Sequence, residues 1–415
     1  MRIQLIAIGS TGDVLPLIVL GKTLIARGHD VSLGAFDTLR PLTEGTGIRF
    51  QTIPGDAKRF IGQVIQPGAS PATYLARLEH ALRDVAIPLL DAYYDICAEA
   101  DLIVSTFFGS LPYTVAGALD IPLVQVNYFP TDRTGYYCMP VMRQLPIGHA
   151  GNRATYRIAY QLIDLLQTRY ITPWCAARGI TPRGISHGLD YSLNGHTVPV
   201  LYAFSEHIVP RPPEWPENLH IVGFWEDAAR EHTPSPALMD FLAAGDTPVY
   251  IGFGSMTSGD MGEALSAVLQ ALERTGLRAV LSSGWGGLDA IATPSYAHIL
   301  HGYIPHSWIF EQTRAVVHHG GAGTTAAGLI AGKPTLVVPF GGDQFFWGER
   351  VHAMDCGPRP LSRTRLTAGR LASALRELVD TLLYAQRARE LGALLRQESG
   401  ADRAADIIER AAREQ

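Results

Sequence analysis

Short apolar runs alternate along the chain with longer stretches in which apolar residues recur every three or four positions. In the first half, the apolar runs predict strands at residues 3–8, 31–36, 102–106 and 123–127. The helical patterns cover residues 14–27, 71–97, 110–119 and 153–178. Because these strands are apolar throughout, we expect a parallel sheet that helices cover on both faces.

A second strand–helix series follows a segment, residues 205–236, that contains six prolines. Proline at this density breaks helices and stiffens an extended connector. The strands of the second series are predicted at residues 249–253, 279–282, 315–318 and 335–339. Its helical patterns cover residues 261–275, 322–331 and 348–354, and the tail from 366 to 413 is helical.

The two series predict an α/β fold of two doubly wound domains that face a central cleft. In such folds, ligands bind at the carboxyl ends of the strands. We expect one domain at residues 1–205, a proline-rich linker at 206–235 and a second domain at 236–395. The helical tail at 396–415 could pack back on the first domain.

Composition narrows the class of protein. Of the 415 residues, 18% are charged and the net charge is −5, which gives no electrostatic case for binding nucleic acid. The four cysteines form no CxxC pair, so we expect neither a disulfide framework nor a cysteine zinc site. No apolar run approaches the ~18 residues of a membrane span. We therefore expect a soluble, cytoplasmic protein.

The first predicted strand runs into Gly9-Ser10-Thr11-Gly12-Asp13, where a helix begins. The segment lacks the G-x-G-x-x-G pattern of a dinucleotide site and the spacing of a phosphate P-loop. Asp13 could be an N-cap whose carboxylate accepts backbone N–H groups. It could equally be a general base at the strand end, and both interpretations can hold together.

The densest signal is His318-His319-Gly320-Gly321-Ala322-Gly323-Thr324-Thr325, between a strand and a helix. The glycines let backbone approach a ligand, and the helix N-terminus offers free N–H groups. This arrangement suits a diphosphate. A tight turn would explain only some of the glycines, and adjacent histidines on a strand point to opposite faces, which disfavours a metal site.

Two further strand ends carry polar groups. Ser255, after Gly252-Phe253-Gly254, could reach the same phosphates, although such turns are common. Asp343 and Gln344, after Pro339, offer acceptors and donors suited to a polyhydroxylated ring. Asp343 could instead cap the helix that follows.

Together, residues 319–325, Pro339 and Asp343-Gln344 resemble the donor signature of nucleotide-sugar glycosyltransferases of the GT-B fold, family 1. Residues 9–16 resemble the opening of sterol glucosyltransferases and of bacterial natural-product and glycopeptide glycosyltransferases. Residues 201–205, 209–216 and 339–347 look most like the sterol branch. The resemblance spans nearly the whole chain and implies two Rossmann-like domains, the first for the acceptor and the second for the donor.

The resemblance assigns roles to matching residues. Asp13 matches a carboxylate proposed as the base, and His319 matches the histidine that binds the diphosphate. A glutamate that contacts the ribose in plant relatives is replaced here by Ala327, so we assign no ribose contact. Trp285 could share base stacking with Tyr303, which stands where plant members have tryptophan. The full donor set is Ser255, Trp285, Tyr303, Ile304, His306, His319, Gly321, Gly323, Thr324, Asp343 and Gln344.

Aromatic and methionine residues after two strands of the first half could line an apolar acceptor pocket. About half of them could equally be ordinary core. The expected acceptor residues are Ser10, Phe107, Phe108, Tyr128, Phe129, Tyr136, Tyr137, Met139 and Met142. A sterol, triterpenoid, flavonoid or macrolide fits this lining. The same loops could touch a membrane surface transiently, although no basic amphipathic helix is evident.

The expected reaction is an inverting, metal-independent transfer of a hexose, glucose from UDP-glucose, with no cofactor beyond this co-substrate. Asp13 accepts the proton of the acceptor hydroxyl, and His319, Ser255 and Thr324 stabilise the leaving diphosphate. A TDP-deoxysugar donor, a nucleotide-sugar epimerase and a non-catalytic nucleotide-sugar-binding relative stay open. We expect a monomer.

Overall fold

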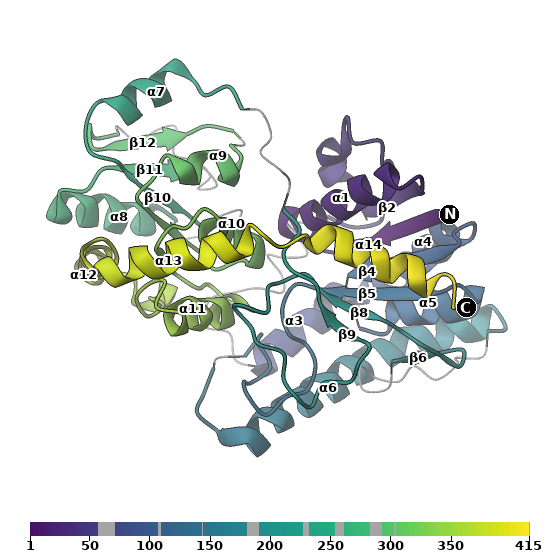
Figure 1. Cartoon of the computed structure of the whole chain (residues 1–415). Coiled ribbons are helices and arrows are strands. Elements are labelled where there is room, and N and C mark those ends of the chain that lie inside the picture. The colour runs from purple at the N-terminus through teal and green to yellow at the C-terminus, as the bar shows by residue number, and fades with distance from the viewer. Residues whose placement is uncertain are drawn as a thin grey trace. The chain divides into compact units, whose positions relative to one another are not determined.

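The computed structural model describes residues 1–56, 71–106, 109–142, 144–180, 191–226, 232–253, 261–282, 293–302 and 304–414. These residues form two compact units (Figure 1). Unit 1 contains the described residues up to Trp225 together with the final segment from Ser399. Unit 2 contains those of Glu226–Glu398.

Unit 1 is built on a seven-stranded sheet in the order β3-β2-β1-β4-β5-β8-β9, and every neighbouring pair is parallel. A separate antiparallel hairpin is formed by β6 and β7. The strands are β1 (Arg2–Ile6), β2 (Asp30–Phe36), β3 (Arg49–Ile53), β4 (Leu102–Thr106), β5 (Leu123–Asn127), β6 (Ser192–Leu193), β7 (His196–Thr197), β8 (Val200–Tyr202) and β9 (Leu219–Ile221).

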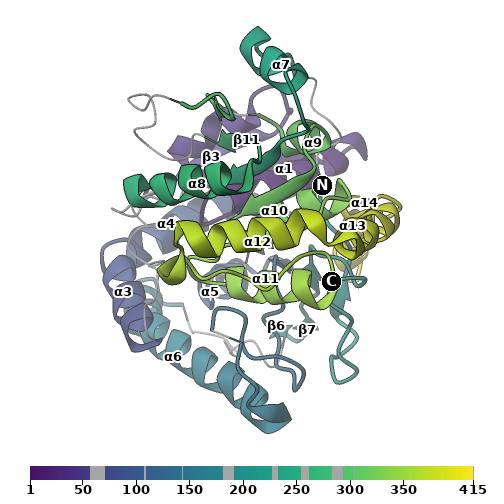
Figure 2. The ribbon, with the colours of Figure 1, turned by 90° about the vertical axis from the view of Figure 1, so that its left-hand side faces the viewer.

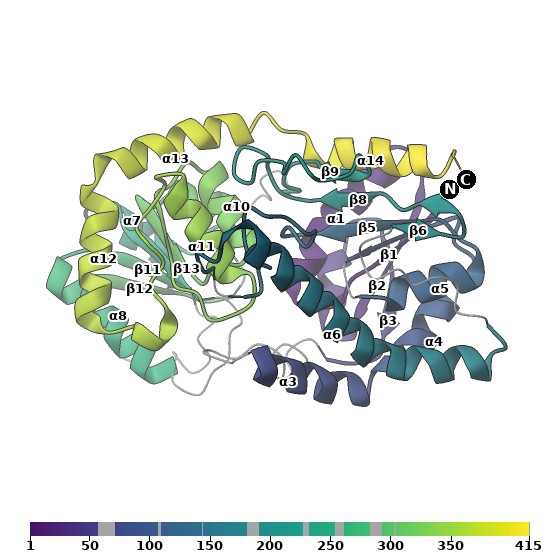
Figure 3. The ribbon, with the colours of Figure 1, turned by 90° about the horizontal axis from the view of Figure 1, so that it is seen from below.

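Helices connect these strands and cover the sheet. They are α1 (Thr11–Ala26), the 3-10 helix η1 (Asp37–Thr43), α3 (Pro71–Arg83), α4 (Ala86–Cys97), α5 (Leu111–Leu119) and α6 (Gly148–Ala177), with α14 (Gly400–Ala411) at the end of the chain. Figure 3 shows α6 running obliquely past α3 and α4. The strands β4 and β5 are buried along their whole length, as expected of parallel strands covered on both faces.

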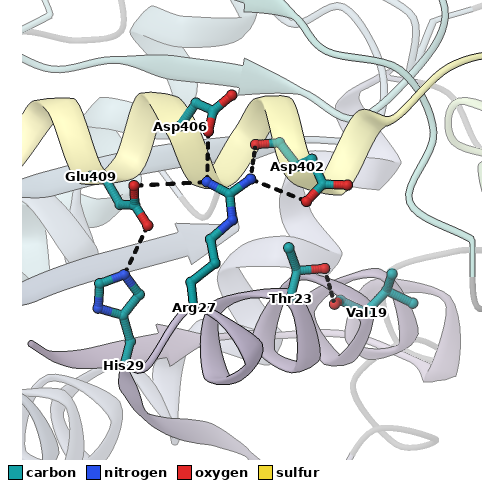
Figure 4. Close-up of polar contacts among 7 residues, drawn as sticks. All are labelled: Val19, Thr23, Arg27, His29, Asp402, Asp406 and Glu409. Carbon is teal, nitrogen blue, oxygen red and sulfur yellow. Dashed lines mark hydrogen bonds and ion pairs between the residues drawn. The ribbon is translucent and has the colours of Figure 1, made fainter.

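The last helix, α14, packs on α1 and is held there by charge (Figure 4). Arg27, just after α1, contacts Asp406 at 2.6 Å, Asp402 at 3.0 Å and Glu409 at 3.7 Å. His29 Nε2 lies 3.0 Å from Glu409. Because one guanidinium serves three carboxylates spaced along one helix face, the contact fixes the position of α14 along α1.

Unit 2 is built on a five-stranded parallel sheet in the order β12-β11-β10-β13-β14. Its strands are β10 (Val249–Gly252), β11 (Ala279–Ser282), β12 (Ala297–Leu300), β13 (Ala315–His318) and β14 (Thr335–Val337). Its helices are α7 (Pro236–Ala243), α8 (Met261–Thr275), α9 (His306–Glu311), α10 (Ala322–Ile330), α11 (Gln344–Ala353), η3 (Arg363–Arg365), α12 (Ala368–Asp380) and α13 (Leu382–Leu395). Figure 2 shows α8 and α12 side by side, and both pack on one face of this sheet.

Several elements differ from the sequence prediction. The single helix predicted at residues 71–97 is instead two helices, α3 and α4, with a break between Arg83 and Ala86. The strands β3, β6, β7, β8, β9 and β12 were not predicted. β9 lies within the proline-rich segment and pairs with β8 at the edge of the unit 1 sheet. Three residues that complete an edge give no periodic signal of their own.

Candidate functional site

Asp13 lies in the first turn of α1, directly after β1, with its carboxylate turned back on the preceding loop. Its Oδ2 accepts hydrogen bonds from the Ser10 backbone N–H at 2.6 Å and from Ser10 Oγ at 3.1 Å. Ser10 is the N-cap, and its Oγ accepts from the Gly12 N–H at 3.2 Å. The N-cap interpretation of Asp13 is therefore wrong. Ser10 is the N-cap, and Asp13, three positions later, is its partner in a capping box.

Burial disfavours the ionised form of the Asp13 carboxyl group. It raises the pKa of Asp13 from 3.8 to about 6, and the hydrogen bonds from Ser10 oppose that rise. Gly9 makes room for the group: its φ is +144°, and a Cβ there would lie 2.1 Å from Asp13 Oδ2. A carboxyl that exchanges its proton near neutral pH, at the carboxyl end of β1, is suited to general-base chemistry.

The loop after β5 is tied to the same turn. Tyr128 donates a hydrogen bond from its hydroxyl to the Asp13 backbone carbonyl at 2.7 Å. Tyr128 and Phe129 are half-buried. The structure therefore brings Ser10, Asp13 and Tyr128 together within unit 1.

The other predicted acceptor residues are divided between core and surface. Met139 is buried against Tyr156 and Tyr160, and Tyr137 and Met142 pack on that cluster. Tyr136 is 57% exposed and stacks edge-on against His149. Phe107 and Phe108 lie outside the described residues.

A buried acid that sequence analysis missed lies in the same loop. Tyr202 donates its hydroxyl to the Asp132 carboxylate and accepts from the Asp132 N–H at 3.0 Å. Thr131 Oγ1 lies 3.3 Å from the same hydroxyl and accepts from Asn127 Nδ2 at 2.9 Å. Asp132 is 4% exposed, and burial raises its pKa to about 7. Asp132 and Tyr202 are seventy positions apart in the sequence, so no local signal predicts this pair.

We expect Asp132→Asn to change how stability depends on pH. The unfolded group ionises near its ordinary pKa of 3.8, whereas the native group keeps its proton until about pH 7. The native state thus binds more protons in that window, and this group's contribution to the free energy of unfolding falls as pH rises from about 4 to about 7. The Asn variant should lack this fall, so its stability relative to the wild type should rise through the window.

Urea denaturation at several pH values measures this difference. Asp101→Asn is the matched control, because Arg2 lowers the pKa of Asp101 and the sign is reversed. There the variant should lose relative stability as pH rises through the acid range. A difference between Asp132→Asn and the wild type that does not vary with pH would contradict the assignment.

In unit 2, the loop between β13 and α10 is shaped by glycine and histidine. The Gly320 N–H donates to His318 Nδ1 at 2.8 Å, which places the His318 proton on Nε2. Gly320 has φ +95°, and a Cβ there would meet Val337 Cγ1 at 2.6 Å and the Gln344 carbonyl at 2.9 Å. Only glycine fits this turn.

Ring nitrogens at this loop are buried without partners. His318 Nε2 and His319 Nδ1 have no hydrogen-bond partner among the described residues. Burial lowers the pKa of His319 and of His306 to about 4 and that of His318 well below its usual value, with neighbouring imidazoles adding to the effect on His318 and His319. These imidazoles are neutral near pH 7, so they would bind an anion through N–H groups and not through fixed charge.

The start of α10 completes this set of donors. Gly321 is the N-cap and supplies no side chain. The Thr325 hydroxyl donates to the Gly321 carbonyl at 2.9 Å, whereas the half-buried Thr324 hydroxyl makes no hydrogen bond within the part of the chain that the structure describes. Gly323 is exposed. Free N–H groups, a hydroxyl and a neutral imidazole make a cradle for a phosphate group.

The predicted sugar-binding pair begins α11. Asp343 is its N-cap residue, without a side-chain cap bond, and its Oδ2 accepts from Trp347 Nε1 at 3.0 Å. Gln344 Oε1 accepts from the N–H groups of Phe340 and Gly341 at 2.7 and 3.2 Å. The side-chain oxygen of Gln344 is therefore used in hydrogen bonds to the backbone of the preceding loop. The side-chain NH₂ of Gln344 remains as the group that could bind a ligand.

The remaining donor residues are described in part. His306 opens α9 and stacks on Phe310, with ring centroids 4.7 Å apart. Ile304 packs on the cluster that includes Phe310. Ser255, Trp285 and Tyr303 lie outside the described residues. Within the described ranges, no group of three or more His, Cys, Asp or Glu side chains could hold a metal ion.

Comparison with known proteins covers both units. The model of the glycosyltransferase family 28 N-terminal domain matches residues 3–122, and that of the erythromycin biosynthesis protein CIII-like C-terminal domain matches residues 290–409. O-mycaminosyltylonolide 6-deoxyallosyltransferase of Streptomyces fradiae is 34% identical over 99% of this chain and 97% of its own length.

A sterol 3-beta-glucosyltransferase of Arabidopsis thaliana is 32% identical over 96% of this chain, which spans 64% of that protein. The crystal structure of the kitacinnamycin glycosyltransferase superposes with a TM-score of 0.70, at 20% identity, over 99% of this chain and 98% of its own. The fold predicted from the sequence is thereby confirmed. The chain belongs to the family 1 glycosyltransferases of the GT-B fold.

Proposed function

We propose that this protein is an inverting, metal-independent glycosyltransferase that moves glucose from UDP-glucose onto a hydroxyl of a lipophilic acceptor. A sterol, triterpenoid, flavonoid or macrolide would serve as the acceptor. Residues 1–205 would bind the acceptor, and residues 236–395 the nucleotide sugar. The observation that carries the proposal is Asp13, a carboxyl whose pKa is raised to about 6 at a strand end, in a chain of this family.

The proposed reaction is a direct displacement at the anomeric carbon of the sugar. Asp13 takes the proton of the acceptor hydroxyl as that oxygen forms a bond to the anomeric carbon. The bond from the anomeric carbon to the diphosphate oxygen breaks on the opposite face, and the diphosphate leaves with the electron pair. A base of pKa about 6 is far weaker than an alkoxide, so proton transfer is completed late in the transition state.

The leaving group collects negative charge, which the β13–α10 loop would stabilise. His319, Thr324 and the N–H groups at the start of α10 would donate to its oxygens, and Asp343 and the Gln344 NH₂ would hold the sugar hydroxyls. The buried, unpartnered Nδ1 of His319 supports this role. The transfer needs no cofactor in this scheme, and a chelator should leave the rate unchanged.

The macrolide relative supports a second candidate, a TDP-deoxysugar donor, because its name specifies transfer of a deoxyallosyl group. A mass-spectrometric screen of UDP-glucose and TDP-deoxysugars against the acceptor classes above distinguishes the two. A product heavier by one hexose supports the first proposal, and one heavier by a deoxyhexose supports the second. Conversion of the donor into a different nucleotide sugar without any acceptor would indicate an epimerase and contradict both proposals.

A further inference from the structure

One face of α6 carries large apolar side chains in solvent. Ile158 is 56% exposed and Leu165 is 71% exposed. Residues spaced by three and four positions share a face of a helix. The residues at this spacing are Ile147, just before the helix, then Gly151, Ala154, Ile158, Leu162 and Leu165; Gly151 and Leu162 are half-buried and the other four are exposed. Gly151 lies against Ile147, which continues the row past the start of the helix.

The loop before α6 extends this apolar face. Leu145 is 52% exposed and Ile147 45%. The Tyr136 ring lies 5.4 Å from that of His149 in the first turn of α6, so the loop and the helix share one surface. We name the set Tyr136, Leu145, Ile147, Ile158 and Leu165 the α6 surface. Figure 3 shows α6 in front of the strands of unit 1 in that view.

This surface lies in a basic part of an acidic chain. From residue 133 to residue 169 the sequence has five arginines and one acidic residue, Asp164, although the net charge of the chain is −5. Arg153 pairs with Glu214 at 3.5 Å. Arg133 and Arg157 are exposed and form no ion pair with the residues that the structure describes. Their charges are therefore available to an anionic partner.

We infer that the α6 surface docks on an anionic lipid bilayer. Exposed apolar residues are ordinary when scattered, but several of them along one helix face beside unpaired arginines are the pattern of an interfacial helix. Apolar side chains would enter the acyl boundary while arginines meet headgroup phosphates. A two-fold dimer through this face would set two surfaces of the same positive charge against each other, which disfavours a second copy as the occupant.

The proposal goes beyond the sequence expectation, in which no basic amphipathic helix was evident. The helix predicted at residues 153–178 began after the first turn of α6, and the sequence alone does not show which side chains of the helix are exposed. The inference does not depend on sugar transfer, because docking needs neither donor nor acceptor.

Cosedimentation with vesicles tests it, using the full chain without nucleotide sugar. We expect binding to phosphatidylcholine vesicles that contain phosphatidylglycerol and much weaker binding to phosphatidylcholine alone. The double variant Ile158→Ser/Leu165→Ser should bind about tenfold more weakly. Arg133→Gln/Arg157→Gln should bind the anionic vesicles about thirtyfold more weakly. Leu382→Ser is the matched control, because Leu382 is 83% exposed but lies on α13 of unit 2.

Melting curves of each variant establish that it is folded. The inference is overturned if the wild type does not sediment with anionic vesicles, if the α6 variants bind like the wild type, or if Leu382→Ser loses as much binding as they do. It is also overturned if the α6 variants change only the oligomeric state of the protein, since the surface would then belong to a protein partner. None of these outcomes tests the proposed sugar transfer, which is measured separately with a soluble acceptor.

Discussion

Asp13→Asn should lower kcat by about 10²- to 10⁴-fold, the usual contribution of a positioned general base. The substitution keeps an oxygen that can accept the Ser10 N–H, so the capping box and the start of α1 should survive. It removes the group whose pKa lies near neutral pH. Nucleoside diphosphate binding, which we assign to unit 2, should be unchanged. Steady-state kinetics and calorimetric titration with UDP measure the two effects separately.

Asp132→Asn is the matched control for this prediction. It also removes a carboxyl of raised pKa from unit 1, but one that faces the Tyr202 hydroxyl. Its kcat should fall far less than that of the Asp13 variant. If Asp13→Asn turns over near the wild-type rate with an unchanged melting temperature, Asp13 is not the base.

His319→Ala should weaken UDP binding and lower kcat by about 10²- to 10³-fold, as loss of one donor to a developing anion typically does. The imidazole is neutral near pH 7, and its Nδ1 is buried without a partner among the described residues. A bound phosphate oxygen would supply that partner. The effect should appear in titration with UDP as well as in turnover, unlike that of Asp13→Asn.

His298→Ala serves as the control for His319→Ala. His298 is in β12 of the same unit and lies against Phe241, with ring centroids 5.3 Å apart. Its loss should leave UDP affinity close to the wild-type value. Equal UDP affinity in His319→Ala and the wild type would remove His319 from the donor site.

The sequence predicted best those elements whose burial is uniform. The bounds of β4, β5, β11 and β13 match the predicted runs, since each is a short apolar strand within a parallel sheet. The edge strand β3, with the sequence Arg-Phe-Gln-Thr-Ile, is only partly buried and has no such run. Pairing with β2, and not its own pattern, makes it a strand.

The same distinction holds at the site. Asp13 and His319 could be found because each stands in a dense local motif at a strand end. Ser10-x-x-Asp13 also has the spacing of a capping box, a signal that the sequence contained and the N-cap interpretation missed. The bond between Asp132 and Tyr202 joins residues seventy positions apart, and the raised pKa of Asp132 exists only once the fold buries it.

The pH dependence of kcat/KM for the acceptor tests the central claim most directly. Because Asp13 must be ionised to accept a proton, the wild-type value should rise with pH and level off above about 6. Asp132→Asn should keep this rise, and the residual activity of Asp13→Asn should lack it. A wild-type profile that is flat between about pH 5 and pH 8, or the same rise in Asp13→Asn, would contradict the account.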